Sequence, residues 1–327
     1  MSEVSLFDRL KEGDINACYQ YLDHASLGGE ALVKYLNTLL YYAVSINWEN
    51  NVKDHPIIVI NAMKNIIADN IDKPSKILLN HGLDILIGKQ VRDDKKYLSD
   101  IEVSGPSTTV FVGSLEDAIQ ANDWEKAKIL NAKIFLASDR SRAIIDTIAD
   151  IGLQNIQSNA LFIFHILRAF HFKQEKSQVW AYACCLLDVV QSNSLPSPHN
   201  KKDIDPGKFI DSILSYNDFE LLLTFAAISR IWNEEYVRER SYKREISHWL
   251  YTIQSSIKKN NMDKSEVVID QNINYNNYIN IAEQIISQER TFENISKRII
   301  KLEAIRYFAK TKPNKNLYYY INQLKIS

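Results

Sequence analysis

The chain repeats one short pattern three times, at a spacing near a hundred residues. Each copy has two apolar residues four apart, then glycine or asparagine, an aspartate, an apolar residue and, three positions later, a small or apolar residue. The copies begin at Leu6, Leu115 and Ile210, which gives offsets of 109 and 95 positions. Such repeats are typical of stacked helical units, so we expect three related helical modules of about 95 to 110 residues.

The central dipeptide of each copy predicts where one helix ends and the next begins. These dipeptides are Gly13-Asp14, Asn122-Asp123 and Asn217-Asp218. Glycine and asparagine tolerate the left-handed conformation that closes a helix, and aspartate is a favoured N-cap. Each aspartate is therefore expected to accept a hydrogen bond from a backbone N–H in the turn that follows it.

The rest of the sequence favours an all-α fold. Only nine glycines and seven prolines occur in 327 residues, which is too few for the frequent turns of a sheet-rich chain. Apolar residues recur three and four positions apart, as in the run Leu32, Leu36, Leu39, Leu40, Ala43 and Val44. His55-Pro56 is a further helix start, because proline suits the first helical turn. Whether the modules form a helical-repeat array or close into one globule stays open.

Two segments interrupt the helical rhythm and divide the chain. Residues 92–113 and 193–207 are rich in polar residues, glycine or proline, and we interpret both as linkers. The expected modules are therefore residues 1–91, 114–192 and 208–327. The third module ends in a basic helix.

Composition excludes several classes of function. The net charge of −1 gives no overall attraction to nucleic acid or to an anionic membrane. The longest apolar runs, such as Leu161–Leu167, are too short to span a membrane. Three cysteines are too few for a disulfide framework, and the start of the chain shows no secretory signal, so we expect a cytoplasmic location. No phosphate loop, dinucleotide fingerprint or standard zinc motif occurs, and no cofactor is evident.

Three histidines form one candidate site. His55 and His81 belong to consecutive helices of the first copy, and His165 lies on the matching helix of the second. If these copies pack face to face, the three imidazoles could converge in a cavity and bind a metal ion. His55 and His165 are the candidate catalytic acid–base residues. The simpler interpretation is that each histidine is a satisfied interior side chain.

The basic C-terminal helix is a candidate interaction surface. Its cations include Lys297, Arg298, Lys301, Arg306 and Lys310, with aromatic residues between them. Such a helix could contact phosphates and stack on bases of a nucleic acid. An alternative interpretation is that these residues form the solvated face of a terminal helix whose apolar stripe is buried.

Two stretches resemble a known family. The helix start His55-Pro56-Ile-Ile-Val-Ile-Asn61-Ala62 resembles a segment of the all-helical modules in questin-oxidase-like proteins. The same helix start is also similar to the helical region that accompanies a Rieske iron–sulfur domain in some bacterial proteins. The run Leu115–Ala127, which is followed some forty residues later by His165, shows this similarity too. The resemblance implies an all-α fold and an association with redox chemistry, with His55 and His165 as the matching positions. The Rieske ligand patterns Cys-x-His and Cys-x2-His are missing.

Two hypotheses about function follow. The first is a cytoplasmic helical-repeat protein that acts as a binding or scaffolding module for a protein partner, since helical arrays offer extended grooves. The alternative is an oxidoreductase-like enzyme, similar to questin oxidase, with a histidine-lined cavity between modules.

Overall fold

The structure, a computed structural model, describes residues 5–24, 28–104, 109–259, 277–289 and 291–326. These residues contain α-helices and short 3-10 helices but no β-strand, apart from one isolated antiparallel bridge between Ile46 and Val91. The all-α prediction is therefore confirmed for this part of the chain. No helix in it is long and apolar enough to cross a membrane.

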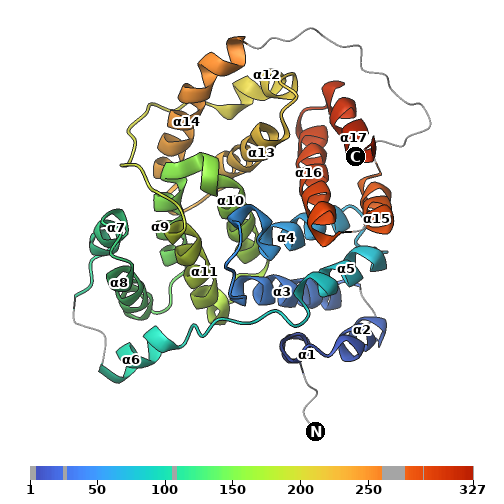
Figure 1. The fold of residues 1–327 in the computed structure, drawn as a ribbon. Coiled ribbons are helices and arrows are strands. Elements are labelled where there is room, and N and C mark those ends of the chain that lie inside the picture. Colours follow the sequence, from blue (N-terminus) through green and yellow to red (C-terminus); the bar gives the residue numbers. More distant parts are fainter. Residues whose placement is uncertain (1–4, 25–27, 105–108, 260–276, 290, 327) are drawn as a thin grey trace.

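Helices follow one another closely along the chain (Figure 1). The first copy contains α1 (Leu6–Glu12), α2 (Ile15–His24), α3 (Glu30–Ser45), α4 (Pro56–Ile67) and α5 (Lys76–Leu86). Next come α6 (Lys96–Ser104), α7 (Val112–Gln120), α8 (Trp124–Ala137), α9 (Ala143–Gly152), α10 (Ile156–Lys173) and α11 (Val179–Gln191). The last are α12 (Ile210–Leu214), α13 (Phe219–Asn233), α14 (Glu239–Lys259), α15 (Tyr278–Gln288), α16 (Phe292–Thr311) and α17 (Asn316–Ile326). Short 3-10 helices span Val52–Asp54, Leu153–Asn155, Lys176–Gln178 and Pro206–Phe209.

The repeated dipeptide has the same local structure in all three copies. Gly13, Asn122 and Asn217 adopt left-handed backbone conformations, with φ angles of 72°, 57° and 58°. The aspartate after each of them caps the next helix by accepting a backbone N–H two or three residues ahead. These bonds join Asp14 to Ala17 at 2.9 Å, Asp123 to Lys126 at 3.3 Å and Asp218 to Glu220 at 2.8 Å. The predicted helix boundaries are confirmed.

Replacing Asp218 with alanine is expected to lower the free energy of unfolding by about 1 kcal/mol, because the cap of α13 is lost. Asp14→Ala and Asp123→Ala should each have an effect of the same size. Urea denaturation followed by circular dichroism measures the change. Asp203→Ala, at an exposed position that caps no helix, is the control and should change stability by less than about 0.5 kcal/mol. Equal effects of Asp203→Ala and Asp218→Ala would contradict the capping role.

Helices from all three copies enclose one centre. α4 of the first copy packs against α10 of the second and α16 of the third, and α13 joins α10 to α16. The four helices thus form a closed ring in the middle of the molecule (Figure 1). The outer helices pack around this ring, so the copies close into a globule and do not extend as an open array.

The segment 92–113 differs from its prediction as a linker. It contains α6, and α7 already begins at Val112. α6 packs against α8, and Ile101 is buried. Tertiary packing therefore stabilises a helix in a charged stretch whose sequence favours a loop. In the second predicted linker, 193–207, residues 193–205 have no regular secondary structure and a 3-10 helix begins at Pro206.

Candidate functional site

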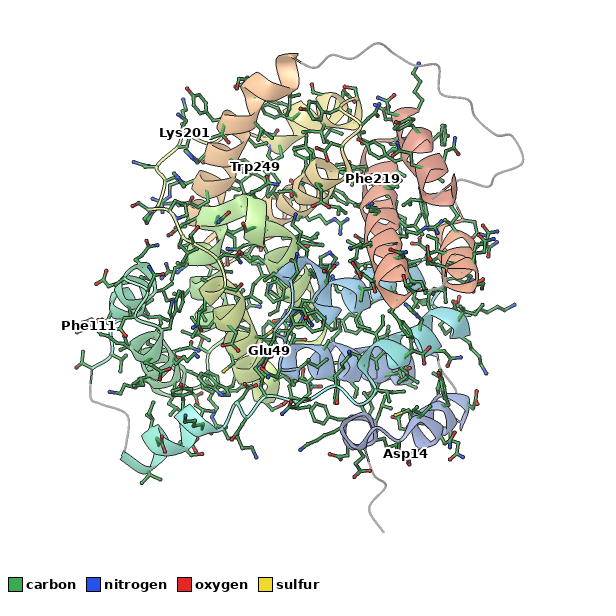
Figure 2. The ribbon with its side chains drawn as sticks, in the orientation of Figure 1. Asp14, Glu49, Phe111, Lys201, Phe219 and Trp249 are labelled. Atoms are coloured by element: carbon green, nitrogen blue, oxygen red, sulfur yellow. The ribbon has the colours of Figure 1, made fainter. Side chains whose placement is uncertain are left out.

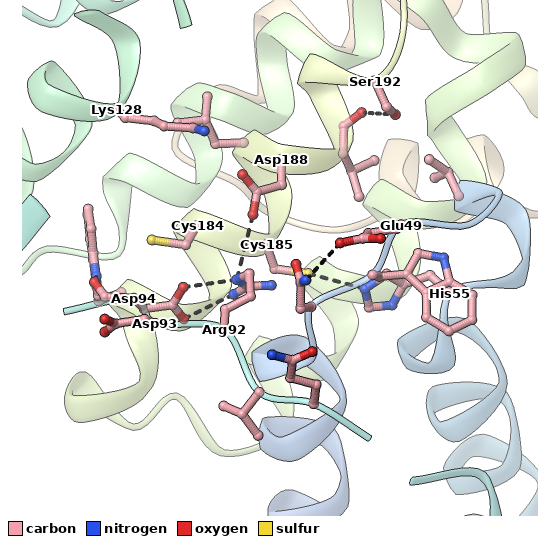
Figure 3. Close-up of a pocket in the computed structure, with 18 of the residues that line it drawn as sticks. Glu49, His55, Arg92, Asp93, Asp94, Lys128, Cys184, Cys185, Asp188 and Ser192 are labelled. Carbon is pink, nitrogen blue, oxygen red and sulfur yellow. Dashed lines mark hydrogen bonds and ion pairs between the residues drawn. The ribbon is translucent and has the colours of Figure 1, made fainter. Parts of the chain in front are cut away.

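A cavity of about 600 Å³ lies between the first and second copies. We call it the inter-copy cleft. The loop after α3, His55 at the start of α4 and the segment after α5 form one side, and α8 and α11 form the other. Figure 2 places Glu49, one of its lining residues, between the ribbons of α3 and α11, and Figure 3 shows the cleft in detail.

Arg92 holds the two sides of the cleft together. Its guanidinium group forms a two-pronged ion pair with Asp94, with N–O distances of 2.9 and 3.0 Å. It also donates to the backbone carbonyls of Ile46, at the end of α3, and Ala181, in α11, each at 3.1 Å. Asp188 on α11 lies 3.6 Å from the same group. Arg92 therefore links the first copy to the second (Figure 3).

Negative charge predominates in the cleft. Four carboxylates and two cations line it, a surplus of two negative charges. The carboxylates belong to Glu49, Asp93, Asp94 and Asp188, and the cations to Arg92 and Lys128. Glu49 and Asp93 are exposed. Burial raises the pKa of the Asp188 carboxyl, against the opposing effect of Arg92 and Lys128.

Aromatic rings form much of the remaining wall. Trp48, Tyr97 and Trp180 all line the cleft. The indole N–H of Trp180 donates to the backbone carbonyl of Asp94 at 2.5 Å, which fixes that ring. The combination of aromatic faces and carboxylates suits a cationic group more than an anionic or apolar one.

One buried acceptor in the wall has no donor among the described residues. It is Oδ1 of Asn131 on α8, a residue that is 1% exposed. An amide oxygen buried in this way costs about 1–3 kcal/mol if nothing donates to it. A ligand in the inter-copy cleft that donates a hydrogen bond would remove that cost.

The two thiols of the cleft are not activated. Burial raises the pKa of Cys185 to about 12, and burial also raises that of Cys184 well above its usual value. Both groups are therefore protonated at neutral pH, whereas a nucleophilic cysteine needs a thiolate. Cys185 Sγ lies 3.5 Å from Nε2 of His55.

His55 caps α4. Its Nδ1 accepts the backbone N–H of Ile57 at 3.2 Å, so the neutral ring carries its hydrogen on Nε2 and directs it toward Cys185. Trp48 and Phe162 pack beside the ring, and His55 is 1% exposed. With Nδ1 occupied and Nε2 protonated, the ring has no free acceptor for a proton. These contacts suit a structural cap, and the catalytic role of His55 stays a prediction.

The burial of the His55 imidazole should affect how the free energy of unfolding depends on pH. Burial, followed by Arg92, lowers the pKa of His55 to about 3 in the folded chain, and the unfolded value is near 6.5. As pH falls, the unfolded state takes up the proton first. The contribution of neutral His55 is therefore complete above about pH 6.5 and is lost progressively toward about pH 3.

In a His55→Asn variant, whose asparagine can still cap α4, this loss should be absent. The free energy of unfolding of the native chain and of the variant is measured by denaturant titration at several pH values from 7 to 4. The difference between the two should decrease by up to about 1.4 kcal/mol for each unit that the pH falls. The other buried histidines are present in both proteins and cancel. Parallel curves would show that His55 does not titrate in this way.

His165 and His81 lie elsewhere. His165 on α10 is buried, and its Nδ1 accepts the side-chain N–H of Asn61 at 2.8 Å. His81 on α5 stacks on Phe292 with ring centres 5.6 Å apart, and its Nε2 has no hydrogen-bond partner among the residues described. Burial lowers the pKa of both imidazoles.

Of the three histidines, only His55 lines the inter-copy cleft. No group of three histidine, cysteine, aspartate or glutamate residues in the described part of the chain could hold a metal ion. The expected convergence of the three histidines is not observed, because α4, α5 and α10 direct them to separate surroundings.

The five basic residues of the C-terminal helix also have partners within the chain. Four of them pair with carboxylates: Lys297 with Glu293, Arg298 with Glu289, and Arg306 and Lys310 with Asp69. The fifth, Lys301, lies over the ring of Phe219 at 4.6 Å. The apolar stripe of α16 is largely buried, as the alternative interpretation predicts. This pairing leaves little charge free for nucleic acid.

Sequence reasoning missed most of the inter-copy cleft. Arg92 and Asp94 fall in a segment interpreted as a linker. Asn131 offered one available signal, because it is a polar residue on the face of α8 whose other buried residues are apolar. The contribution of Trp48 depends on long-range packing that no local pattern reveals.

Comparison of the chain with protein-family models, with curated proteins and with solved structures found no match.

Proposed function

We propose that this chain is a helical scaffold that binds a protein partner, and that the inter-copy cleft takes a basic side chain of that partner. The cleft lies at the junction of two modules and opens between elements that are distant in the sequence. Its volume of about 600 Å³ is large enough for a lysine or arginine side chain with neighbouring backbone.

The observation that carries this proposal is the unpartnered Oδ1 of Asn131 in a cleft with surplus carboxylates. Both kinds of group accept hydrogen bonds, and a lysine ammonium or arginine guanidinium only donates them. A basic side chain would therefore satisfy the buried amide oxygen and reduce the negative charge at the same time. An acidic ligand would do neither.

The aromatic wall supports the same ligand class. Cations bind favourably over the faces of tryptophan and tyrosine, and two tryptophans and one tyrosine line the cleft. Arg92 keeps these walls together without donating to a ligand, since its guanidinium group already has four protein partners.

The oxidoreductase-like alternative, with a cavity lined by several histidines, has weaker support. Only His55 reaches the inter-copy cleft, and its Nδ1 is used as a helix cap. Elemental analysis and an absorption spectrum of the purified protein would test for bound metal, flavin or haem directly. Any of these would favour the alternative.

A labelled peptide tests the binding proposal. The probe is a fluorescent heptapeptide with one central arginine among glycine and serine, compared with the same peptide carrying citrulline, which has the same shape without the charge. The arginine peptide should bind, and Asp188→Asn should weaken it about tenfold because a charge-assisted contact is lost. Fluorescence anisotropy measures both affinities.

The matched control is Glu235→Gln, which removes one negative charge from an exposed position outside the cleft. It should leave the affinity unchanged. Equal binding of the citrulline peptide, or no binding of the arginine peptide up to about 1 mM, would refute recognition of a basic side chain.

A further inference from the structure

A second cavity, of about 280 Å³, lies at one end of the ring formed by α4, α10, α13 and α16. We call it the ring-end pocket. All four helices contribute to its lining, and its charged residues are Arg168, Arg230, Glu234, Glu303, Arg306 and Lys310. It shares no residue with the inter-copy cleft and has the opposite charge.

Ion pairs account for only part of the positive charge. Arg230 pairs with Glu303 at 2.8 Å, and Arg168 pairs with Glu234 at 3.2 Å. Arg306 and Lys310 share the single carboxylate of Asp69. Four cations thus face three carboxylates, which leaves one positive charge in excess.

Lys64 on α4 places a further basic side chain beside this cluster. It is 6% exposed, and its ammonium lies 4.9 Å from the ring centre of Phe172. Among the described residues no carboxylate lies within ion-pair distance of that ammonium. Burial, followed by Arg168, lowers the pKa of Lys64 to about 7, against the opposing effect of Glu303 and Glu234.

Arg230 also has unused hydrogen-bonding capacity at the floor of the pocket. The residue is 8% exposed, and its Nε has no hydrogen-bond partner within the part of the chain that the structure describes. The rings of Phe164 and Tyr307 enclose the guanidinium group from two sides, at 4.5 and 4.3 Å. A buried guanidinium N–H that has no acceptor is costly, and the excess positive charge around it favours an anion as that acceptor.

We propose that the ring-end pocket binds a small oxyanion, a phosphate or a carboxylate dianion, between Arg168, Arg230 and Lys310. Two of these side chains can reach a ligand that enters from solvent, because Arg168 is 47% and Lys310 is 52% exposed. Planar guanidinium groups match the paired oxygens of phosphate and carboxylate. The volume of about 280 Å³ suits a small anion, and the surplus charge excludes a cation.

Isothermal titration of the purified chain with inorganic phosphate, and separately with succinate, tests this site at low ionic strength. At least one of the two should bind, and the tighter one identifies the group as phosphoryl or carboxylate. Arg168→Gln and Lys310→Gln should each weaken that binding about tenfold, as expected when a charge-assisted hydrogen bond is lost. Both positions are about half exposed, so the variants should fold, and circular dichroism checks this.

Matched controls separate a built site from general charge attraction. Arg140→Gln removes an arginine of similar exposure, 54%, and Lys312→Gln removes a lysine of similar exposure, 44%; neither lines the pocket. Both should bind the anion as the native chain does. Controls that weaken binding as much as Arg168→Gln, or no binding of either anion up to about 10 mM, would overturn the proposal.

Discussion

Replacing Arg230 with methionine is expected to lower the free energy of unfolding by about 3–5 kcal/mol. Arg230 and Glu303 are 8% and 3% exposed and form an ion pair at 2.8 Å between α13 and α16. Methionine fills much of the same space, but of its side-chain partners in the described segments Glu303 keeps only the hydrogen bond from Asn65, at 3.0 Å. The loss is large because the carboxylate of Glu303 stays buried without its arginine at the end of the ring. Guanidinium chloride denaturation measures it.

A double variant shows whether the buried charge is the cause. Arg230→Met combined with Glu303→Leu removes both charges and should recover most of the stability, since replacing a buried pair with apolar residues is often neutral. If the double variant is as unstable as the single one, lost packing between Phe164 and Tyr307 explains the effect instead. A loss below about 1 kcal/mol in the single variant would contradict the expected cost of an unpaired charge.

Replacing Arg92 with methionine is expected to cost about 3 kcal/mol. The change removes the two-pronged pair with Asp94 and leaves the backbone carbonyls of Ile46 and Ala181 without their donor. Because these partners belong to the first and second copies, the junction between the copies should weaken first. Hydrogen exchange should become faster at the end of α3 and in α11 before it changes in α16.

The control for this prediction is Arg140→Met. Arg140 is about half exposed and makes one contact with Glu102, at 3.4 Å, so its loss should change stability by less than about 0.5 kcal/mol. If the two arginine variants lose similar amounts of stability, Arg92 does not specifically join the two copies. Hydrogen exchange that becomes faster by the same factor throughout Arg92→Met would lead to the same conclusion.

Helix starts and ends could be predicted well from the sequence. The three glycine-aspartate or asparagine-aspartate dipeptides and the His55-Pro56 start all mark helix boundaries in the structure. Their signals are local, because a cap acts on N–H groups within one turn. The helix α6 was missed because its formation depends on packing against α8 and not on its own polar sequence.

The candidate sites were less predictable. His55 was identified from the sequence, but its partner Cys185 is 130 positions away. The basic residues of α16 were recognised as a cluster, yet Arg306 pairs with Asp69 across 237 positions. A sequence pattern shows which side chains are charged or buried, but it does not show which distant group neutralises them.

The sequence by itself determined the local structure: three capped helix pairs, their apolar faces and the all-α class. The tertiary structure decided how these copies are used. The helix pair α1–α2, joined at Asp14, lies at the edge of the molecule in Figure 2, whereas α13, which begins after Asp218, belongs to the central ring. Capping and apolar periodicity act over a few residues and repeat with the sequence. Closure of the ring, by contrast, depends on packing and ion pairs between residues of different copies.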